Sequence, residues 1–363
     1  MGAETDARVR AAIEDHGPIG FDEYIRIALY GPGGFFETPP IGADRHFVTG
    51  PHIHPFVFSH CVREAMLDAW VALGEPDPFP IVELGAGDGT FADALLNAFG
   101  ELPMPAPDYT AVEISPGGRD ALAARGLTAV EHLRAREPFE GVVFANELLD
   151  NLPFVLARCR AEGVHEVRIG QSDGALVEVE VPWSHDELEP PGLSPGEDAT
   201  VPVGAFEMLE ALSTRLDRGY ALLIDYGRAG EHAVQGYRAH RRISDVLADP
   251  GGSDITTGID VNAIAAHAAS LGLQAFGPVA QADALAALGL ERWERSSLEH
   301  QAELQRAGRG SDAVRIWQTR SLARLLVDPA GLGGFWWLVL ATRGLPPPGW
   351  LLHVGSTDHP DRR

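Results

Sequence analysis

Lysine is absent from the sequence of 363 residues, and cysteine occurs only twice, as Cys61 and Cys159. Two cysteines cannot build a disulfide framework or a thiolate metal cluster, so we expect each to be a small buried side chain. Long hydrophobic runs are also missing, because the longest one, at residues 335–341, is far too short to span a bilayer. Residues 1–15 lack the apolar segment of a secretory signal. We therefore expect a cytoplasmic protein.

Basic residues are scarce relative to acidic ones. The chain has 28 arginines against 52 aspartates and glutamates, which gives a net charge of −24. Binding along a phosphate backbone needs a basic face, so this balance argues against nucleic acid as the partner. An acidic surface can attract a basic peptide, although solubility alone also explains it. With 45% hydrophobic residues, the chain has enough apolar side chains for one large or two modest domains.

Short apolar strands alternate with helical patterns in the middle of the chain. Continuous apolar strands between helices are typical of a parallel sheet that is covered by helices on both faces. The sequence therefore predicts an α/β fold. The predicted strands are FPIVELG (79–85), DYTAVEIS (108–115), LTAVEHL (127–133), GVVFAN (141–146) and GYALLIDYG (219–227).

The remaining segments predict additions to this sheet. Residues 1–75 read as an N-terminal helical cap with a loop, rich in Gly and Pro, that is long enough to suggest a functional role. Residues 155–205 alternate as antiparallel strands do, and residues 259–325 are mostly helical. A closing strand is predicted at 332–344, and its aromatic run is expected to lie in the core. Residues 346–363 read as a polar tail.

A glycine-rich loop, VELGAGDGT, joins the first strand to its helix at residues 82–90. Closely spaced glycines let the backbone turn tightly and approach a ligand at the carboxyl edge of the sheet. A dinucleotide-binding fingerprint would need glycine where the chain has Thr90, and a P-loop would need a Gly-Lys-Ser/Thr ending, which is missing. The pattern that remains is E-x-G-x-G-x-G, beginning at Glu83.

This pattern resembles motif I of class I S-adenosylmethionine-dependent methyltransferases. A cationic cofactor without phosphates suits a site lined with carboxylates. The resemblance implies that Glu83 faces the methionine amino group, directly or through water. It also implies that Glu113, at the end of the next strand, accepts the two ribose hydroxyls, although Glu113 could instead be an exposed acid. The expected residues for S-adenosyl-L-methionine are Glu83, Gly85, Gly87, Gly89, Thr90, Glu113 and Ile114.

The segment FANELLDNLPF, at residues 144–154, contains a pattern that a generic methyltransferase lacks. Its Asn-Glu-x-x-Asp-x-Leu-Pro pattern resembles the signature of the MidA-like family of S-adenosylmethionine-dependent methyltransferases. Other segments agree with that family, in the family's order. They are FDEYIRIALYGPGGFF (21–36), FVTGP (47–51), AVEISP (111–116), LLIDYG (222–227), YRAHR (237–241), PGGSDITTGIDVNAI (250–264) and GPVAQADALAALG (277–289).

The resemblance implies a Rossmann-like methyltransferase domain at residues 76–345, with a seven-stranded, mostly parallel sheet. The family's mitochondrial members are protein-arginine methyltransferases that assist the assembly of respiratory complex I. An arginine in a protein or peptide is therefore the first candidate substrate, and a homodimer is a further possibility. Two alternatives are a cofactor-binding assembly factor with little catalysis and a small-molecule methyltransferase. The loop at 45–51 departs from the family's usual Gly-Asp-Phe and Thr-Ser-Pro.

The acidic part of FANELLDNLPF supplies the expected catalytic residues Glu147, Asp150 and Asn146. Two carboxylates can hold the planar fork of a guanidinium, and one can accept the proton that methylation releases. Because Glu147 and Asp150 are three residues apart, a helical turn would place both on one side. Better-known arginine methyltransferases have Ser-Glu where this chain has Asn146-Glu147. Alternatively, Asp150 caps a turn and Glu147 accepts backbone amides, while Asn146 is expected to orient its neighbours.

Other polar residues give weaker signals. Four histidines lie close together in the sequence and could belong to a zinc site, but no further ligand spacing completes one, so ordinary loop histidines are favoured. Asp225 ends a predicted strand, which favours a supporting role at the same crevice. His240 could reach the site or make a structural hydrogen bond. The four clustered histidines are His46, His52, His54 and His60.

Overall fold

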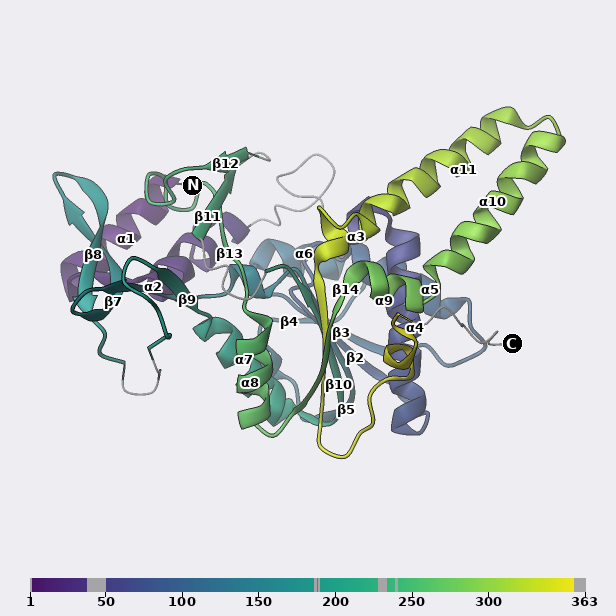
Figure 1. The fold of residues 1–363 in the computed structure, drawn as a ribbon, viewed down its shortest axis with the longest axis horizontal. Helices are drawn as coiled ribbons and strands as arrows, with labels where there is room; N and C mark the ends of the chain where they lie inside the picture. Colours follow the sequence, from purple (N-terminus) through teal and green to yellow (C-terminus); the bar gives the residue numbers. More distant parts are fainter. Residues whose placement is uncertain are drawn as a thin grey trace.

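A mixed sheet of seven strands forms the centre of the protein, in the order β14-β15-β10-β5-β2-β3-β4 (Figure 1). This computed structural model describes residues 2–37, 50–185, 188, 190–227, 234–238 and 241–355. Strand β15 runs antiparallel to both of its neighbours, whereas the pairs from β10 to β4 are parallel. The predicted sheet is confirmed. Its strands are β2 (Pro80–Leu84), β3 (Asp108–Val112), β4 (Ala129–Val130), β5 (Phe139–Asn146), β10 (Leu216–Asp225), β14 (Gln274–Ala280) and β15 (Trp336–Ala341).

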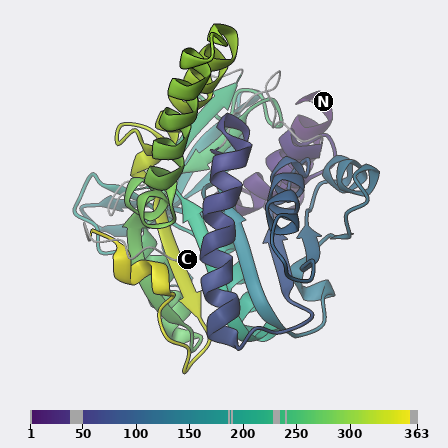
Figure 2. The ribbon, with the colours of Figure 1, turned by 90° about the vertical axis from the view of Figure 1, so that its right-hand side faces the viewer.

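Helices cover both faces of this sheet because its inner strands are apolar on both sides. Helix α4 (Pro55–Leu73) lies along one face, as Figure 2 shows, and packs against α5 (Thr90–Gly100). Helices α7 (Val203–Arg215) and α8 (Val261–Ser270) pack on the other face. Helix α6 (Pro116–Ala124) packs with α4 and α5 through Leu122. Short 3₁₀ turns occur at Leu133–Ala135, Leu149–Asn151 and Leu332–Gly334.

A second lobe stands beside the sheet, at the left of Figure 1. The predicted antiparallel insertion forms it, and the N-terminal helices pack against the insertion through a shared apolar cluster. The lobe comprises α1 (Gly2–His16), β1 (Ile19–Gly20), α2 (Phe21–Ile25), a π-helical turn (Arg26–Tyr30), a 3₁₀ turn (Phe35–Glu37), β6 (Val155–Arg160), β7 (Gly163–Ser172), β8 (Ala175–Pro182) and β9 (Asp198–Val201). A small sheet adjoins it, made of β11 (Val234–Arg238), β12 (Arg241–Ile243) and β13 (Asp254–Thr257).

The predicted N-terminal cap at residues 1–75 is therefore two separate units. Residues 2–37 belong to the second lobe, where β1 pairs with β7. In contrast, the short helix α3 (Gly50–Ile53) and α4 belong to the main domain. Helix α4 buries one apolar side, including Phe58, Val62 and Met66, against the central sheet. Its ends follow from the sequence, because His54 caps the first turn and Gly74 ends the helix with φ of +91°.

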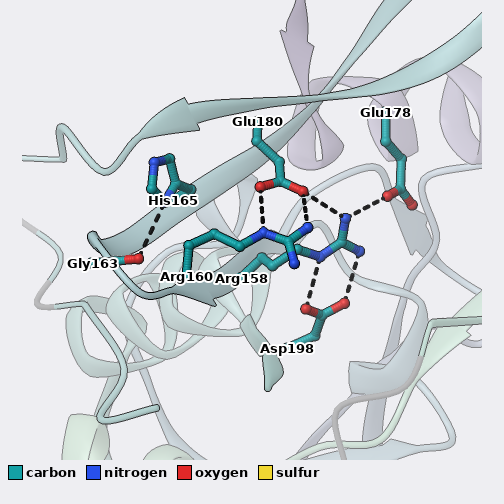
Figure 3. A network of polar contacts seen from close by, with 7 residues as sticks. All are labelled: Arg158, Arg160, Gly163, His165, Glu178, Glu180 and Asp198. Carbon is teal, nitrogen blue, oxygen red and sulfur yellow. Dashed lines mark hydrogen bonds and ion pairs between the residues drawn. The ribbon is translucent and has the colours of Figure 1, made fainter. Parts of the chain in front are cut away.

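Arginines on β6 tie three strands of the insertion together (Figure 3). Arg158 donates from Nε and Nη2 to the two carboxylate oxygens of Asp198 on β9, each at 2.8 Å. Its Nη1 donates to Glu178 on β8 at 2.8 Å and to Glu180 at 3.2 Å. Arg160 donates to Glu180 as well. The side chains of β6 thus link β8 and β9 across the sheet.

The predicted helical region at residues 259–325 contains one strand of the central sheet. Strand β14 pairs with β15 and forms the edge, so the region as a whole is not an insertion. The strand was not predicted from its sequence, QAFGPVA, because a Gly-Pro pair is unusual within a strand. In the structure this pair shifts the register between Phe276 and Val279. The other elements are helices: α8, α9 (Gln281–Ala287), α10 (Leu290–Arg306) and α11 (Gly310–Ala323), followed by a 3₁₀ turn (Arg324–Val327). The α10–α11 hairpin projects from the main domain in Figures 1 and 2.

The predicted polar tail begins later than residue 346. A 3₁₀ turn, Gly349–His353, buries Trp350 against Trp337, with ring centroids 6.0 Å apart. The backbone N–H of Trp350 donates to Asp68 on α4 at 2.6 Å. Residues 346–355 therefore complete the core, and the rest of the predicted tail lies outside the described residues. Trp337 is fully buried, as expected for the aromatic run.

Candidate active site

A cavity of about 760 Å³ opens where the strands β2, β3 and β5 end. The central sheet supplies one wall through the glycine loop and the ends of β3 and β5. The N-terminal lobe supplies the opposite wall, and α7 supplies part of the rim. Central-sheet residues in the lining include Gly85, Gly87, Glu113, Ile114, Glu147 and Leu148, and those from the N-terminal lobe include Arg26, Tyr30, Gly31, Pro32, Phe36 and Glu37.

The glycine loop has the tight geometry that its sequence predicts. Gly85, Gly87 and Gly89 hold φ angles of +70°, +57° and +80°, a region that disfavours side chains. A Cβ atom at Gly85 would lie 2.9 Å from the side chain of Leu148, so a substitution there would displace Leu148, which also lines the cavity, in addition to straining the backbone. Gly89 and Thr90 do not line the cavity. Instead they begin α5, where the Thr90 amide donates to Asp88 at 2.9 Å.

Glu113 lies in the cavity wall at the end of β3. Its two carboxylate oxygens accept the backbone amides of Gly87 and Ser115, each at 2.8 Å, so two loops fix its orientation. Each oxygen retains a second lone pair for a ligand hydroxyl. Next to it, Ile114 exposes 38% of its surface, an apolar platform at the same wall.

Glu83 lies outside the cavity lining. It is 5% exposed, and its carboxylate accepts a hydrogen bond from the hydroxyl of Tyr109 on β3. Burial raises the pKa of Glu83 to about 8. Of the two expected ways for Glu83 to reach the methionine amino group, directly or through water, its position outside the lining favours the indirect one.

Glu147 follows β5 in an unusual backbone conformation. Its φ is +51°, in the left-handed region that few glutamates adopt and that is often found at functional sites. Its backbone N–H donates to Ile224 on β10 at 2.8 Å. Its Oε1 accepts the Gly50 amide at 3.2 Å and the side-chain amide of Asn146 at 3.0 Å. Burial raises its pKa to about 7, against the effect of these two donors.

Asp150 does not face the cavity with Glu147. The left-handed Glu147 breaks the helical spacing on which that expectation rested, and Asp150 turns into a buried polar layer, where it is 4% exposed. Burial raises its pKa, which a hydrogen bond from Tyr226 opposes. Asp225 is also buried, in contact with the backbone below Glu147. Neither aspartate is among the residues that line the cavity.

The Gly- and Pro-rich loop in this wall was expected to be functional, but Arg26 and Tyr30 just before it had no predicted role, although their segment, YIRIALYGPGG, belongs to the quoted motifs. The Tyr30 hydroxyl donates to the carbonyl of Asn151 at 3.1 Å, which links the N-terminal lobe to the segment after β5. Arg26 forms an ion pair with Glu207 on α7 at 2.7 Å, and both residues line the cavity. These contacts cross between elements far apart in the sequence, so spacing alone could not reveal them.

The clustered histidines have separate partners. His52 lies 3.8 Å from Asp88. Although burial opposes it, the nearby imidazole and the hydrogen bond from the Thr90 amide hold the pKa of Asp88 below its usual value. His54 caps α4, and His60 bonds to Glu101 at 2.9 Å. Within the described part of the chain, no group of three or more His, Cys, Asp or Glu residues is arranged to hold a metal. His46 and His240 lie outside the described residues.

Known proteins resemble this chain in sequence and in structure. A family model described as "Putative S-adenosyl-L-methionine-dependent methyltransferase" matches residues 61–279. The Drosophila melanogaster "Protein arginine methyltransferase NDUFAF7 homolog, mitochondrial" is 28% identical over 370 residues, covering 90% of this chain and 82% of its own. The Xenopus tropicalis "Protein arginine methyltransferase NDUFAF7, mitochondrial" is 27% identical, with 77% and 74% covered.

A solved structure extends the similarity to the whole fold. A Burkholderia thailandensis protein, crystallised with S-adenosyl-homocysteine bound, superposes with a TM-score of 0.83. It is 26% identical, and the alignment covers 97% of this chain and 95% of that one.

Proposed function

This chain belongs to the family of S-adenosyl-L-methionine-dependent methyltransferases, and from that premise we propose that it methylates an arginine side chain in a protein. It has the class I fold, and its cofactor is S-adenosyl-L-methionine. The observation that carries the proposed substrate is Glu147, a carboxylate in the cavity wall directly after β5. The names of the relatives, which are protein arginine methyltransferases, support the same substrate.

The cavity wall suits the cofactor. Glu113 is held by two backbone amides and keeps lone pairs for a pair of ribose hydroxyls. Ile114 offers an apolar surface for the adenine base, and Gly85 allows close approach to the backbone. When bound, the cofactor supplies a methyl group on a sulfonium. Glu83 does not line the cavity, so its effect on the cofactor would be indirect. The Tyr109 hydroxyl fixes the orientation of its carboxylate.

In this proposal, Glu147 holds the guanidinium and accepts the proton that methylation releases. Both hydrogen bonds that it accepts from described residues end on Oε1, and we assign the contact with the guanidinium to Oε2. A carboxylate pairs well with the guanidinium fork, and a pKa of about 7 suits a group that binds as an anion and then takes up a proton. Asn146 orients this carboxylate, and Asp150 supports the turn from within.

Methyl transfer from S-adenosyl-L-methionine with a tritiated methyl group tests this function. The purified chain is incubated with a cell extract of its own organism, with and without the extract proteins, and acid hydrolysates are analysed for methylarginine. We expect label in protein as methylarginine, and its loss with Glu147→Gln. Calorimetry with S-adenosyl-homocysteine should show that this variant still binds the product.

The alternatives give other results. Label in small molecules alone would contradict a protein substrate. Binding of S-adenosyl-homocysteine without transfer to any fraction would identify a cofactor-binding assembly factor.

A second copy of the chain is the proposed partner of the α10–α11 hairpin. Val314, Trp317 and Leu325 are 53%, 52% and 48% exposed on α11 and the turn that follows it. Arginines such as Arg315 and Arg324 flank them, which suits the strongly acidic surface of this chain. Light scattering should give the mass of a dimer, and Trp317→Ser should give the monomer. A wild-type monomer at micromolar concentration would contradict this arrangement.

The cellular compartment of the protein is a separate proposal. Among the described residues, no helix is long and apolar enough to cross a membrane. Cys61 and Cys159 are both buried free thiols, which supports a reducing compartment, and we keep the cytoplasm as the proposal. The relatives above are named mitochondrial. Fractionation of the source cells would separate the two locations.

A further inference from the structure

Asp225 lies directly below the turn that carries Glu147. It is the last residue of β10 and is fully buried. The parallel pairing of β5 and β10 ends one step earlier, at Asn146 and Ile224. Beyond that point β5 has ended, whereas Asp225 still pairs with Trp336 on β15.

Three backbone amides converge on this one carboxylate. Its Oδ2 accepts the amide of Leu149 at 2.7 Å and that of Asp150 at 3.4 Å. Its Oδ1 accepts the amide of Tyr226 at 2.8 Å. Because the left-handed Glu147 turns the chain out of the sheet, Leu149 and Asp150 have lost the strand carbonyls that would otherwise accept their amides. Asp225 replaces these acceptors, and a buried amide without an acceptor would be costly.

A second contact holds the far end of the same turn. The side-chain amide of Asn151 donates to Asp254 on β13 at 2.7 Å and to the Ile255 carbonyl at 3.2 Å. The segments LLIDYG and PGGSDITTG, which contain Asp225 and Asp254, thus meet NELLDNLP in space. Among these contacts, those of Asp225 lie nearest to Glu147 along the chain.

We propose that Asp225 is a positioning residue for the methyl-transfer site. Its carboxylate fixes the turn after β5 and so holds Glu147 in the left-handed conformation from which its side chain reaches the cavity. This inference rests on the proposed role of Glu147. It gives a task to an acid that does not line the cavity, and asparagine could not fill that task, since it would offer one acceptor and turn an NH2 group toward the other amide.

Asp225→Asn tests the proposal, with Asp68→Asn as the matched control. Asp68 also accepts a backbone amide, from Trp350 at 2.6 Å, but it lies on α4 and does not line the cavity. For Asp225→Asn we expect kcat for methylation of the extract proteins to fall about 10²-fold, because a small displacement of a reacting group has that effect. The KM for S-adenosyl-L-methionine and the affinity for S-adenosyl-homocysteine should change less than about threefold. Asp68→Asn should leave kcat unchanged.

A double-variant cycle separates positioning from general damage. If Asp225 acts through Glu147, adding Asp225→Asn to Glu147→Gln should lower kcat no further. A wild-type kcat for Asp225→Asn, or full additivity of the two losses, would overturn the proposal. If Asp225→Asn does not fold, Asp225→Ser replaces it, because a hydroxyl keeps one acceptor without an opposing NH2 group.

A crystal structure of Asp225→Asn tests the proposal without a measurement of activity. We expect residue 147 to leave the positive φ region when Asp225 is replaced, and an unchanged φ would overturn the inference. Wild-type protein without methyl transfer, combined with a relaxed turn in the variant, would instead refute the proposed function and leave the positioning of Glu147 intact.

Discussion

Glu147 lines the cavity, where it would meet a substrate, but the residue is half-buried. Burial raises its pKa to about 7, and the amides of Gly50 and Asn146 stabilise its ionised form less than burial disfavours it. A guanidinium is held by the ionised form only. The proposed reaction should therefore depend on pH within the neutral range, where an ordinary glutamate would be fully ionised.

We expect kcat/KM for the protein substrate to rise as the pH increases through about 7 and then to level off, because kcat/KM reports the pKa of the free enzyme. Below that pH, Glu147 is protonated and cannot pair with the guanidinium. Rates of methyl transfer at pH 5.5 to 9 should show this single step, and Glu147→Gln should lower kcat by about 10²- to 10⁴-fold and remove the step. A wild-type rate that stays constant over this range would contradict the assignment of Glu147.

Residue identity was easier to predict than residue orientation. The acid at the end of β3 was expected in the cavity, and Glu113 lies there. Asp150 was expected beside Glu147, but the helical spacing behind that expectation fails because Glu147 has a positive φ. Nothing in the sequence NELLD indicates a left-handed glutamate, since we attribute that conformation to Asp225, which accepts the amide of Asp150 from 75 residues further along the chain. Long-range hydrogen bonds of this kind are not visible as local patterns.

Among the elements, the insertion sheet depends on one arginine more than on its neighbour. The side chain of Arg158 is only 19% exposed and contacts three carboxylates on two strands, whereas that of Arg160 is 43% exposed and pairs with Glu180 (Figure 3). The partly shielded, bidentate contact with Asp198 should be the stronger one.

Replacing Arg158 by methionine keeps most of the aliphatic stem but removes the charge. We expect Arg158→Met to lower the free energy of unfolding by about 1–2 kcal/mol, and Arg160→Met to lower it by less. Urea titrations at 0.05 M and 0.5 M NaCl would measure both, and salt should reduce the two losses. Equal losses for the two variants would show that shielding does not distinguish them.

The elements that the sequence predicted well are those with an uninterrupted apolar signal. Strands β5 and β10 are nearly continuous buried runs, and such runs can only be inner strands. Strand β14 is an edge strand with mostly exposed residues and a Gly-Pro pair, so it carries no such signal. The division of the N-terminal region between two lobes was also hidden, because periodicity identifies a buried face of a helix but not the surface that buries it.

At the scale of the whole molecule, several carboxylates are buried in a chain that is already strongly acidic. Burial raises the pKa of Glu83 to about 8 and that of Glu147 to about 7. It also raises the pKa values of Asp225 and Asp254, where the neighbouring Asp150 adds to the effect. At neutral pH, Glu83 and a fraction of Glu147 therefore hold protons in the folded state that the unfolded chain has released.

This excess of bound protons sets the direction of the pH dependence of stability. A carboxyl group whose pKa is raised on folding contributes its full stability below its unfolded pKa, near 4 to 4.5, and loses it as the pH rises through its folded pKa. We expect the free energy of unfolding to fall between about pH 5 and pH 8, by about 1.4 kcal/mol per pH unit for each proton held in excess. Urea denaturation at pH 5, 6, 7 and 8 measures it.

Repulsion among surface acids would produce a similar trend, because the net charge of −24 also develops as carboxyl groups ionise. Salt separates the two causes, since 0.5 M NaCl screens exposed charges but hardly affects buried ones. The fall should therefore persist in high salt, and Glu83→Gln should reduce its slope by about 1.4 kcal/mol per pH unit below pH 8. If the fall disappears in salt and Glu83→Gln leaves it unchanged, the repulsion of surface charges is its cause, and the buried carboxylates are ionised in the folded protein.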